Sequence, residues 1–198
     1  MSKHSFAQTT PTILVMGDSI SAEYGLPRNA GWVHLMEQEL IKDGSSWKVF
    51  NASISGETTA GGISRLPALL QQKHPGLVMI ELGANDALRG LPLSETEKNL
   101  RSMISMSKKS GAKVLLIGMQ IPPNYGRDYT EQFKKIYPRI AKEESVVLTP
   151  FLLAGVADKP ELFQEDHIHP NAAAQSILLK NVWGSMAPYQ SLLREKSR

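Results

Sequence analysis

Short apolar runs alternate with amphipathic segments along the chain. Residues 12–16 (TILVM), 77–81 (LVMIE) and 113–118 (KVLLIG) are almost continuously apolar over the length of a strand. Strands of a parallel sheet that is covered on both faces have this pattern. Residues 47–50 and 146–148 are two weaker strand candidates, so the pattern predicts five strands.

Apolar positions at helical spacing lie between these strands and after the last one. The predicted helices cover residues 32–42, 63–72, 95–110, 129–142 and 171–183. An alternation of strands and helices predicts a parallel sheet with helices on both faces. Because crossovers in such a sheet are right-handed, we predict a three-layer, doubly wound α/β domain with a five-stranded parallel sheet. We assign residues 12–198 to this domain and residues 1–11 to an N-terminal extension.

Polar clusters rich in Ser, Asn, Asp, Gly and His follow three of the predicted strands, and a fourth cluster lies near the C-terminus. Their sequences are GDSIS at residues 17–21, NASISGET at 51–58, GAND at 83–86 and DHIHP at 166–170. In open α/β sheets, ligands bind beyond the carboxyl ends of the strands. The functional site is therefore expected among these clusters.

Ser19, His169 and Asp166 have the side chains that nucleophilic catalysis requires. A serine hydroxyl becomes an effective nucleophile when an imidazole accepts its proton, and a carboxylate on the other ring nitrogen fixes the tautomer of that imidazole. A serine directly after a buried strand can occupy the first turn of a helix, where N–H groups favour negative charge. Taken singly, each residue also has an ordinary interpretation, as a helix cap or a surface side chain.

His167 is a second candidate for the base, because it lies in the same segment as His169. A separation of three residues lets the side chains of Asp166 and His169 lie on one face of a turn. The position next to Asp166 directs the His167 side chain to another face, so we prefer His169.

Three groups can donate hydrogen bonds to the oxygen of a tetrahedral intermediate: the N–H of Ser19, the N–H of Gly56 and the side-chain amide of Asn85. Loss of one such donor lowers the rate by about 10²–10³-fold. A turn residue at Gly56 and a helix cap at Asn85 are the structural alternatives. No Gly-x-Ser-x-Gly surrounds any serine, which excludes the nucleophile elbow of another hydrolase class.

The composition narrows the range of functions. The 22 Lys and Arg residues exceed the 19 Asp and Glu residues by a net charge of only +3, and their scattered positions lead us to expect no nucleic-acid partner. The absence of any 18-residue apolar run leads us to expect no stable membrane insertion. The absence of cysteine excludes thiol catalysis, thiolate metal sites and disulfides.

Together, the four clusters resemble the sequence blocks of the SGNH (GDSL-type) hydrolases, in the same order along the chain. The stretches that carry the resemblance are GDSISAEYGL, NASISGETTAGG, ELGANDALRG, GMQIPPNYG and DHIHPN, within about residues 12–185. Inside that family the chain is similar to the bacterial thioesterase I, arylesterase and lysophospholipase group. The resemblance implies a flavodoxin-like SGNH hydrolase fold and a serine hydrolase that cleaves esters or thioesters through an acyl-enzyme.

The resemblance also implies a role for each candidate. Ser19 is the nucleophile, Asp166 and His169 are the acid and the base, and the N–H of Ser19 forms the oxyanion hole with Gly56 and Asn85. No metal and no cofactor are implied.

Two positions depart from the pattern of this family. Ala84 and His167 stand where glycine is usual. The methyl group of Ala84 is expected beside an oxyanion donor, and His167 leaves the identity of the base open.

Substrate preference is expected to depend on the loops at residues 87–94 and 120–129. The apolar side chains that we assign to an acyl pocket are Leu88, Leu91, Ile121, Pro122 and Tyr125. One methylene in such a pocket changes discrimination by only about 1–3 kcal/mol, so the composition does not define a chain length. We predict esters and thioesters of short to medium acyl chains, as small molecules or lipids.

Two other functions stay open at this level. Asp18, Asn85, Asp86, His167 and His169 have side chains that suit divalent cations, as in a metal-dependent phosphoesterase. The same fold can also serve as a non-catalytic domain that binds acyl groups or lipids.

The location and assembly of the protein are further expectations. Residues 5–8 (SFAQ) have the small-residue pattern that precedes a signal-peptide cleavage site. Relatives of the resembled group are commonly periplasmic or secreted, so we expect the same location here. We expect a monomer.

Overall fold

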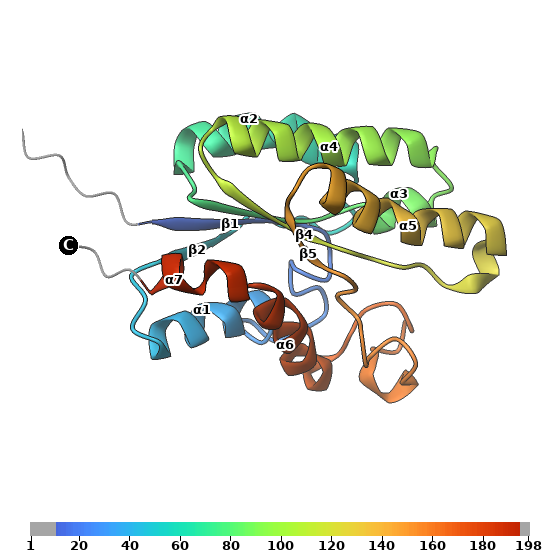
Figure 1. The fold of residues 1–198 in the computed structure, drawn as a ribbon. Helices are drawn as coiled ribbons and strands as arrows, with labels where there is room; N and C mark the ends of the chain where they lie inside the picture. Colours follow the sequence, from blue (N-terminus) through green and yellow to red (C-terminus); the bar gives the residue numbers. More distant parts are fainter. Residues whose placement is uncertain (1–10, 195–198) are drawn as a thin grey trace, which may run out of the picture.

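Five parallel strands form one sheet in the computed structural model, which describes residues 11–194 (Figure 1). The strands are β1 (Thr12–Gly17), β2 (Lys48–Asn51), β3 (Leu77–Glu81), β4 (Lys113–Ile117) and β5 (Val147–Thr149). Their order is β2-β1-β3-β4-β5, and all neighbouring pairs are parallel. The predicted sheet is confirmed, with every strand end within one residue of its predicted position. Most of the predicted N-terminal extension, including residues 5–8, lies outside the described residues.

Helices cover both faces of the sheet, as predicted. On one face lie α2 (Thr59–Lys73), α4 (Leu93–Lys109) and α5 (Arg127–Glu143), and on the other lie α1 (Trp32–Lys42), α6 (Gln175–Ser185) and α7 (Gln190–Leu193) (Figure 1). A short helix, α3 (Ala84–Leu88), follows β3. The three-layer, doubly wound architecture is therefore confirmed.

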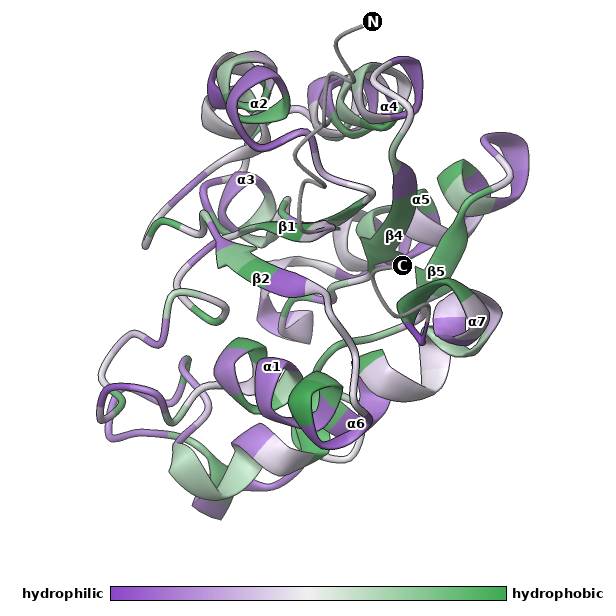
Figure 2. Ribbon diagram, turned by 90° about the vertical axis from the view of Figure 1, so that its left-hand side faces the viewer, coloured by the Kyte–Doolittle hydropathy of each residue, from purple (hydrophilic) through white to green (hydrophobic). Residues whose placement is uncertain are grey.

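The centre of the sheet is the most apolar part of the molecule. All five residues of β3 and residues 13–17 of β1 are buried, whereas the edge strand β2 exposes Lys48 and Asn51. Figure 2 shows β4 and β5 as largely hydrophobic segments between the two helix layers. Because each buried Val, Leu or Ile side chain stabilises the fold by about 1.5–3 kcal/mol, the central strands give the site a rigid support.

Two helices begin more than two residues away from their predicted start, and one short helix was not predicted. Helix α2 begins at Thr59 rather than at residue 63, because the Thr58 side chain accepts a hydrogen bond from the Gly61 N–H (3.3 Å) and caps the helix. The predicted helix at residues 171–183 starts as a 3-10 turn at Ala172–Ala174 before α6. Helix α3 was not predicted.

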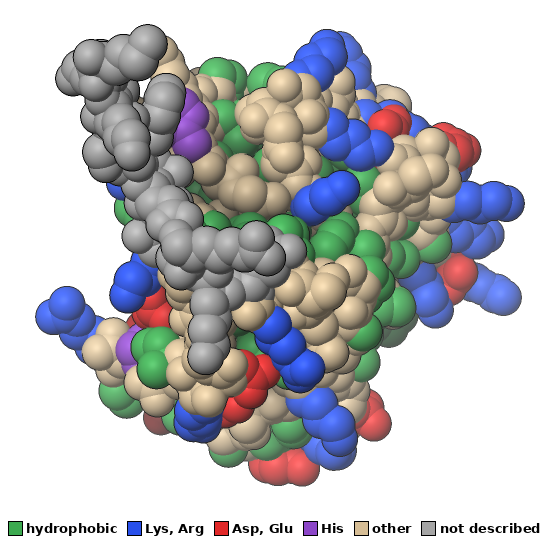
Figure 3. Space-filling model, turned by 60° about the vertical axis from the view of Figure 1, so that its left-hand side comes forward, with side chains coloured by type: hydrophobic (Ala, Val, Ile, Leu, Met, Phe, Trp, Pro, Cys, Tyr) green, Lys and Arg blue, Asp and Glu red, His purple; other side chains and the backbone are tan. Residues whose placement is uncertain are grey.

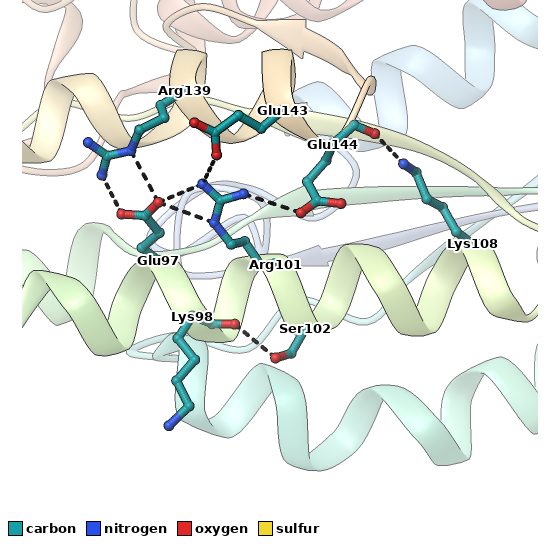
Figure 4. A network of polar contacts seen from close by, with 8 residues as sticks. All are labelled: Glu97, Lys98, Arg101, Ser102, Lys108, Arg139, Glu143 and Glu144. Carbon is teal, nitrogen blue, oxygen red and sulfur yellow. Dashed lines mark hydrogen bonds and ion pairs between the residues drawn. The ribbon is translucent and has the colours of Figure 1, made fainter.

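Ion pairs join α4 to α5 on the side of the molecule shown in Figure 4. Arg101 Nη2 lies 2.7 Å from Glu97 Oε1 and 2.5 Å from Glu143 Oε2, and Arg139 also pairs with Glu97. Partial burial opposes ionisation of Glu97, but the hydrogen bonds and charges of the two arginines lower its pKa. Such partly exposed ion pairs each contribute about 0–1 kcal/mol to the free energy of unfolding. They help to hold α4 against α5 but make only a small part of the stability of the fold.

Charged side chains are spread over the surface. Figure 3 shows Lys and Arg side chains across one face, with Asp and Glu among them. Within residues 11–194, none of the helices has the length and apolar character needed to cross a membrane.

Candidate active site

The carboxyl ends of the strands lie at one edge of the sheet, and the predicted polar clusters meet there. Ser19 follows β1, and His169 lies on the segment between β5 and α6. Although 150 positions separate them, His169 Nε2 lies 2.9 Å from Ser19 Oγ. That distance is within the range of a hydrogen bond that could transfer a proton.

Ser19 lies in a tight turn directly after β1. The Ala22 N–H donates to the Asp18 carbonyl (2.9 Å), and the Tyr24 N–H donates to the Ser19 carbonyl (3.1 Å). These bonds close a single helical turn, and no helix follows it before α1. Ser19 therefore lies at the start of a helical turn, as predicted, but this turn does not continue into a helix.

Asp166 holds the His169 ring from the opposite side. Its Oδ2 lies 2.6 Å from His169 Nδ1, and its Oδ1 accepts hydrogen bonds from the N–H groups of Ile168 (2.9 Å) and His169 (3.0 Å). Partial burial raises the pKa of Asp166, but these bonds outweigh it and lower the pKa to about 2. The carboxylate is therefore ionised at neutral pH and fixes the orientation of the imidazole.

His167 faces away from this arrangement. It is exposed and has a φ of +56°, in the left-handed region that favours glycine. Its N–H donates to the Gln164 carbonyl (3.0 Å), and its ring makes no hydrogen bond or ion pair within residues 11–194. Of the two candidate bases, only His169 lies against Ser19.

Two of the three predicted oxyanion donors have no hydrogen-bond acceptor in the part of the chain that the structure describes. Within residues 11–194, the N–H groups of Ser19 and Gly56 donate no hydrogen bond. Gly56 has a φ of +77°, and its carbonyl accepts a hydrogen bond from Arg89 Nη2 (2.8 Å). This bond to Arg89 fixes the orientation of the Gly56 carbonyl.

Asn85, the third predicted donor, lies in α3 with its amide nitrogen already engaged. Its Nδ2 donates to Asp18 Oδ2 (3.2 Å) and to the Glu57 carbonyl (3.1 Å). These two bonds use both amide hydrogens. A substrate oxygen would have to share or replace one of them. The preceding Ala84 is buried, so its extra methyl group packs into the protein interior.

Asp18 links the serine turn to Asn85. Its Oδ1 accepts from the Ile20 N–H (3.0 Å), and its side chain is almost fully buried. Burial raises the pKa of Asp18 to about 6, against the lowering effects of the Ile20 N–H and of His169. From the sequence, Asp18 was considered as a metal ligand, and this positioning contact was missed.

Tyr24 is a second residue that the sequence analysis missed. Its ring centroid lies 4.4 Å from that of His169, and its carbonyl accepts a hydrogen bond from Gln164 Nε2 (2.8 Å). Tyr24 therefore connects the turn of Ser19 to the segment of His169. A tyrosine five positions after the serine was the signal available in the sequence.

The predicted acyl-pocket residues divide into two groups. Leu91 and Tyr125 are 39% and 42% exposed, Pro122 is also exposed and Leu88 is half-buried. Ile121 is buried in the hydrophobic core, so it supports the loop from within and does not line an open acyl pocket. A cavity of about 290 Å³ between α5 and the β5 end contains none of the five; its lining is Gln120, Glu131, Lys134, Lys135, Pro138, Leu148, Pro150 and Phe151.

The carboxylates considered as metal ligands are engaged with the protein. Asp86 Oδ2 accepts from the Thr59 N–H (2.9 Å), and Asp86 Oδ1 accepts from the Thr59 hydroxyl (2.5 Å). Both Asp18 oxygens also accept hydrogen bonds. Among residues 11–194 there is no group of three or more His, Asp or Glu side chains arranged to hold a metal ion.

Comparison with known proteins identifies the family of the chain. The model of the GDSL-like Lipase/Acylhydrolase family matches residues 15–177. The chain is 50% identical to Esterase TesA of Pseudomonas aeruginosa over 89% of this chain and 88% of the relative. It is 45% identical to thioesterase 1/protease 1/lysophospholipase L1 of Escherichia coli K12 over 87% of this chain and 81% of the relative.

Solved structures give the same result. A crystal structure of TesA has a TM-score of 0.87 and covers 89% of this chain and 98% of its own, at 50% identity. A structure of the psychrotrophic esterase EstA from Pseudoalteromonas sp., inhibited by monoethylphosphonate, has a TM-score of 0.86 at 39% identity and covers 91% of this chain and 98% of its own. The chain belongs to the GDSL-like lipase/acylhydrolase family and is a carboxylic ester hydrolase of the SGNH type.

Proposed function

We propose that Ser19, His169 and Asp166 form a catalytic triad that hydrolyses carboxylic esters and thioesters through an acyl-enzyme. One observation carries the proposal: an unbroken chain of contacts runs from Asp166 Oδ2 to His169 Nδ1 (2.6 Å) and from His169 Nε2 to Ser19 Oγ (2.9 Å). The names of the relatives, which include an esterase, an arylesterase and a thioesterase, support the same substrate class.

In the first half of the reaction, Ser19 Oγ attacks the carbonyl carbon while His169 Nε2 accepts the hydroxyl proton. The carbonyl oxygen takes up negative charge, which the free N–H groups of Ser19 and Gly56 stabilise together with the Asn85 amide. His169 then protonates the leaving alcohol or thiol. The acyl group stays bound to Ser19.

In the second half, water takes the place of the alcohol. His169 accepts a proton from the water, the resulting hydroxide attacks the acyl-enzyme, and the acid is released as Ser19 recovers its proton. Asp166 stays ionised throughout and stabilises the imidazolium that forms in each half.

Replacement of Asp166 by asparagine should lower kcat for p-nitrophenyl butyrate by about 10²–10⁴-fold. The asparagine oxygen can still accept from the N–H groups of Ile168 and His169, but its amide group would face His169 Nδ1 as a second donor. The ring would then carry its proton on Nε2, where it cannot accept one from Ser19. A variant with more than one tenth of the wild-type kcat would contradict this role of the carboxylate.

The same carboxylate predicts a pH effect on stability. Because the pKa of Asp166 is about 2 in the folded protein and about 3.8 when unperturbed, its stabilising contribution is present above pH 3.8. That contribution is lost as the pH falls toward 2. The wild-type melting temperature should therefore fall more between pH 5 and pH 2.5 than that of the Asp166→Asn variant. The difference should be small because the carboxylate is 37% exposed.

We assign short to medium acyl chains to the exposed apolar positions after β3 and β4. Leu91 and Tyr125 present apolar surface to solvent near α3 and the 3-10 helix Pro123–Tyr125. Two exposed side chains and a proline offer apolar surface to only a few methylene groups of a substrate. Each methylene that they bury contributes about 0.8 kcal/mol to binding.

A series of p-nitrophenyl esters from C2 to C16 tests this assignment. The kcat/KM should rise with chain length, reach a maximum among the short and medium chains, and then fall. Leu91→Ala should move the maximum and lower kcat/KM for medium chains by about three- to tenfold, as expected for loss of a few methylene contacts. A steady rise of kcat/KM to C16 would contradict the assignment.

We propose a periplasmic or secreted location, as the family resemblance implies, and we propose a monomer. Cell fractionation of the source organism, with sedimentation of the purified protein, tests both. Activity confined to the cytoplasm, or a dimer at micromolar concentration, would contradict them.

A further inference from the structure

A fully buried carboxylate, Glu81, contacts the turn of Ser19 from two sides. Glu81 is the last residue of β3, and its backbone pairs in register with Gly17 at the end of β1. Its Oε2 accepts hydrogen bonds from the Asp18 N–H (3.2 Å) and from the Ser21 hydroxyl (2.7 Å). One carboxylate oxygen therefore binds residues on both sides of Ser19.

Gly17 leaves the space that this contact needs. A Cβ atom at position 17 would lie 2.7 Å from Glu81 Oε2 and 2.7 Å from Ser21 Cβ, much closer than real side chains approach. Gly17, the first residue of the GDS sequence, is therefore required for the close approach of the Glu81 carboxylate to the turn.

Residues of the helix layer that contains α1 and α6 hold the Ser21 hydroxyl in place. Trp32 Nε1 donates to Ser21 Oγ (3.2 Å), and the Trp32 N–H donates to Gln175 Oε1 (3.0 Å) at the start of α6. Trp32, Ser21 and Gln175 are all buried. A buried chain of hydrogen bonds therefore runs from α6 through α1 to Glu81 and the serine turn.

This arrangement is costly for the fold. The second oxygen of Glu81, Oε1, is buried and makes no hydrogen bond within residues 11–194. Burial, and then the charge of Asp18, raise the pKa of Glu81 well above its usual range. This shift favours the neutral form of the acid. An apolar side chain of similar size would remove both the desolvation and the unpaired oxygen, but it would leave the Asp18 N–H and the Ser21 hydroxyl without this acceptor. The glutamate is therefore explained by the turn that it binds and not by packing alone.

We propose that Glu81 is a positioning residue for the reaction. It holds the backbone of Asp18 and the side chain of Ser21 so that the Ser19 hydroxyl stays aligned with His169. Through Asp18, whose carboxylate accepts from Asn85, it also keeps that oxyanion donor in place. The inference rests on the proposed nucleophilic role of Ser19.

Two substitutions at this position separate positioning from packing. Glu81→Gln keeps an oxygen that accepts both bonds and places an amide where Oε1 stood, so its kcat should stay within about threefold of wild type. Glu81→Met keeps the volume but removes the acceptor. Its kcat for p-nitrophenyl butyrate should fall by about 10²-fold with KM changed less than twofold, because the loss affects alignment in the chemical step. A lower kcat at an almost unchanged KM, in a variant whose melting curve shows a folded protein, is a result that a purely structural role would not predict.

Ser21→Ala provides a second, milder test and keeps the inference testable if Glu81→Met does not fold. Removal of one of the two bonds should lower kcat by on the order of tenfold. In the Glu81→Met background the same change should have little further effect, because the two residues act as one unit. Wild-type kcat in a folded Glu81→Met or Ser21→Ala variant would overturn the inference, as would an equal loss in Glu81→Gln and Glu81→Met.

Labelling with a fluorophosphonate distinguishes failure of this inference from failure of the proposed function. Glu81→Met should still reach one label per chain on Ser19, at a rate reduced in parallel with kcat. A wild-type protein that is not labelled at Ser19 would refute the triad itself. A Glu81→Met variant labelled at the wild-type rate would refute only the positioning role.

Discussion

Replacement of Ser19 by alanine should reduce turnover of p-nitrophenyl butyrate by about 10⁴-fold or more. The change removes only the Oγ atom that lies 2.9 Å from His169 Nε2. The backbone bonds of the turn, from Ala22 to Asp18 and from Tyr24 to Ser19, do not involve the hydroxyl and should persist. Initial rates at saturating substrate, with a melting curve to show the unchanged fold, provide the measurement.

Ser191 offers a matched control for this variant. It is an exposed serine in α7, and the carbonyls of Leu192 and Leu193 in that helix bind the segment before β2, at the opposite edge of the sheet. Ser191→Ala should keep the full wild-type rate. A Ser19→Ala enzyme with a rate near wild type would show that another group attacks the substrate.

The second large effect is expected at the histidines. His169→Ala should lower kcat by about 10⁴-fold, because without the imidazole no base within reach accepts the Ser19 proton. His167→Gly should keep kcat within about threefold and should not lower the melting temperature, because glycine adopts the φ of +56° at this position more readily than histidine does.

The comparison of these two variants tests which histidine is the base. Both variants lose an imidazole from the same segment. If the substitutions acted only by disturbing the backbone of this segment, both variants would lose activity. A large loss in His167→Gly with activity retained in His169→Ala would reverse the assignment. The pH dependence of kcat/KM in His167→Gly should match that of wild type, since the ring of His167 contacts no catalytic group.

The strands were predictable because their signal is local. β1, β3 and β4 are buried on both faces, so each had to be a continuous apolar run. Helix α3 was not predictable in this way. It has only five residues and begins after Gly83. The φ of +118° at Gly83, and the Tyr137 hydroxyl that would clash with a Cβ there, depend on the tertiary fold.

The chemistry of the site was partly predictable. Ser, Asp and Asn are ordinary turn residues when taken singly, but four polar clusters in the order of the family blocks stand out together, and these blocks give each residue a role. Glu81 gave no such signal, because a glutamate at the end of an apolar run looks like the exposed end of a strand. Its burial results from the packing of β1 and the Ser19 turn against it, which depends on contacts about 60 positions apart in the sequence.

Stoichiometric labelling with a fluorophosphonate, followed by mass-spectrometric mapping of the modified residue, tests the shared site of Ser19 and His169 most directly. Such reagents bond to a serine whose hydroxyl is activated by a neighbouring base. The account predicts one label per chain, located on Ser19 and abolished in His169→Ala. An unlabelled protein with full esterase activity, or a label on a different serine, would contradict it.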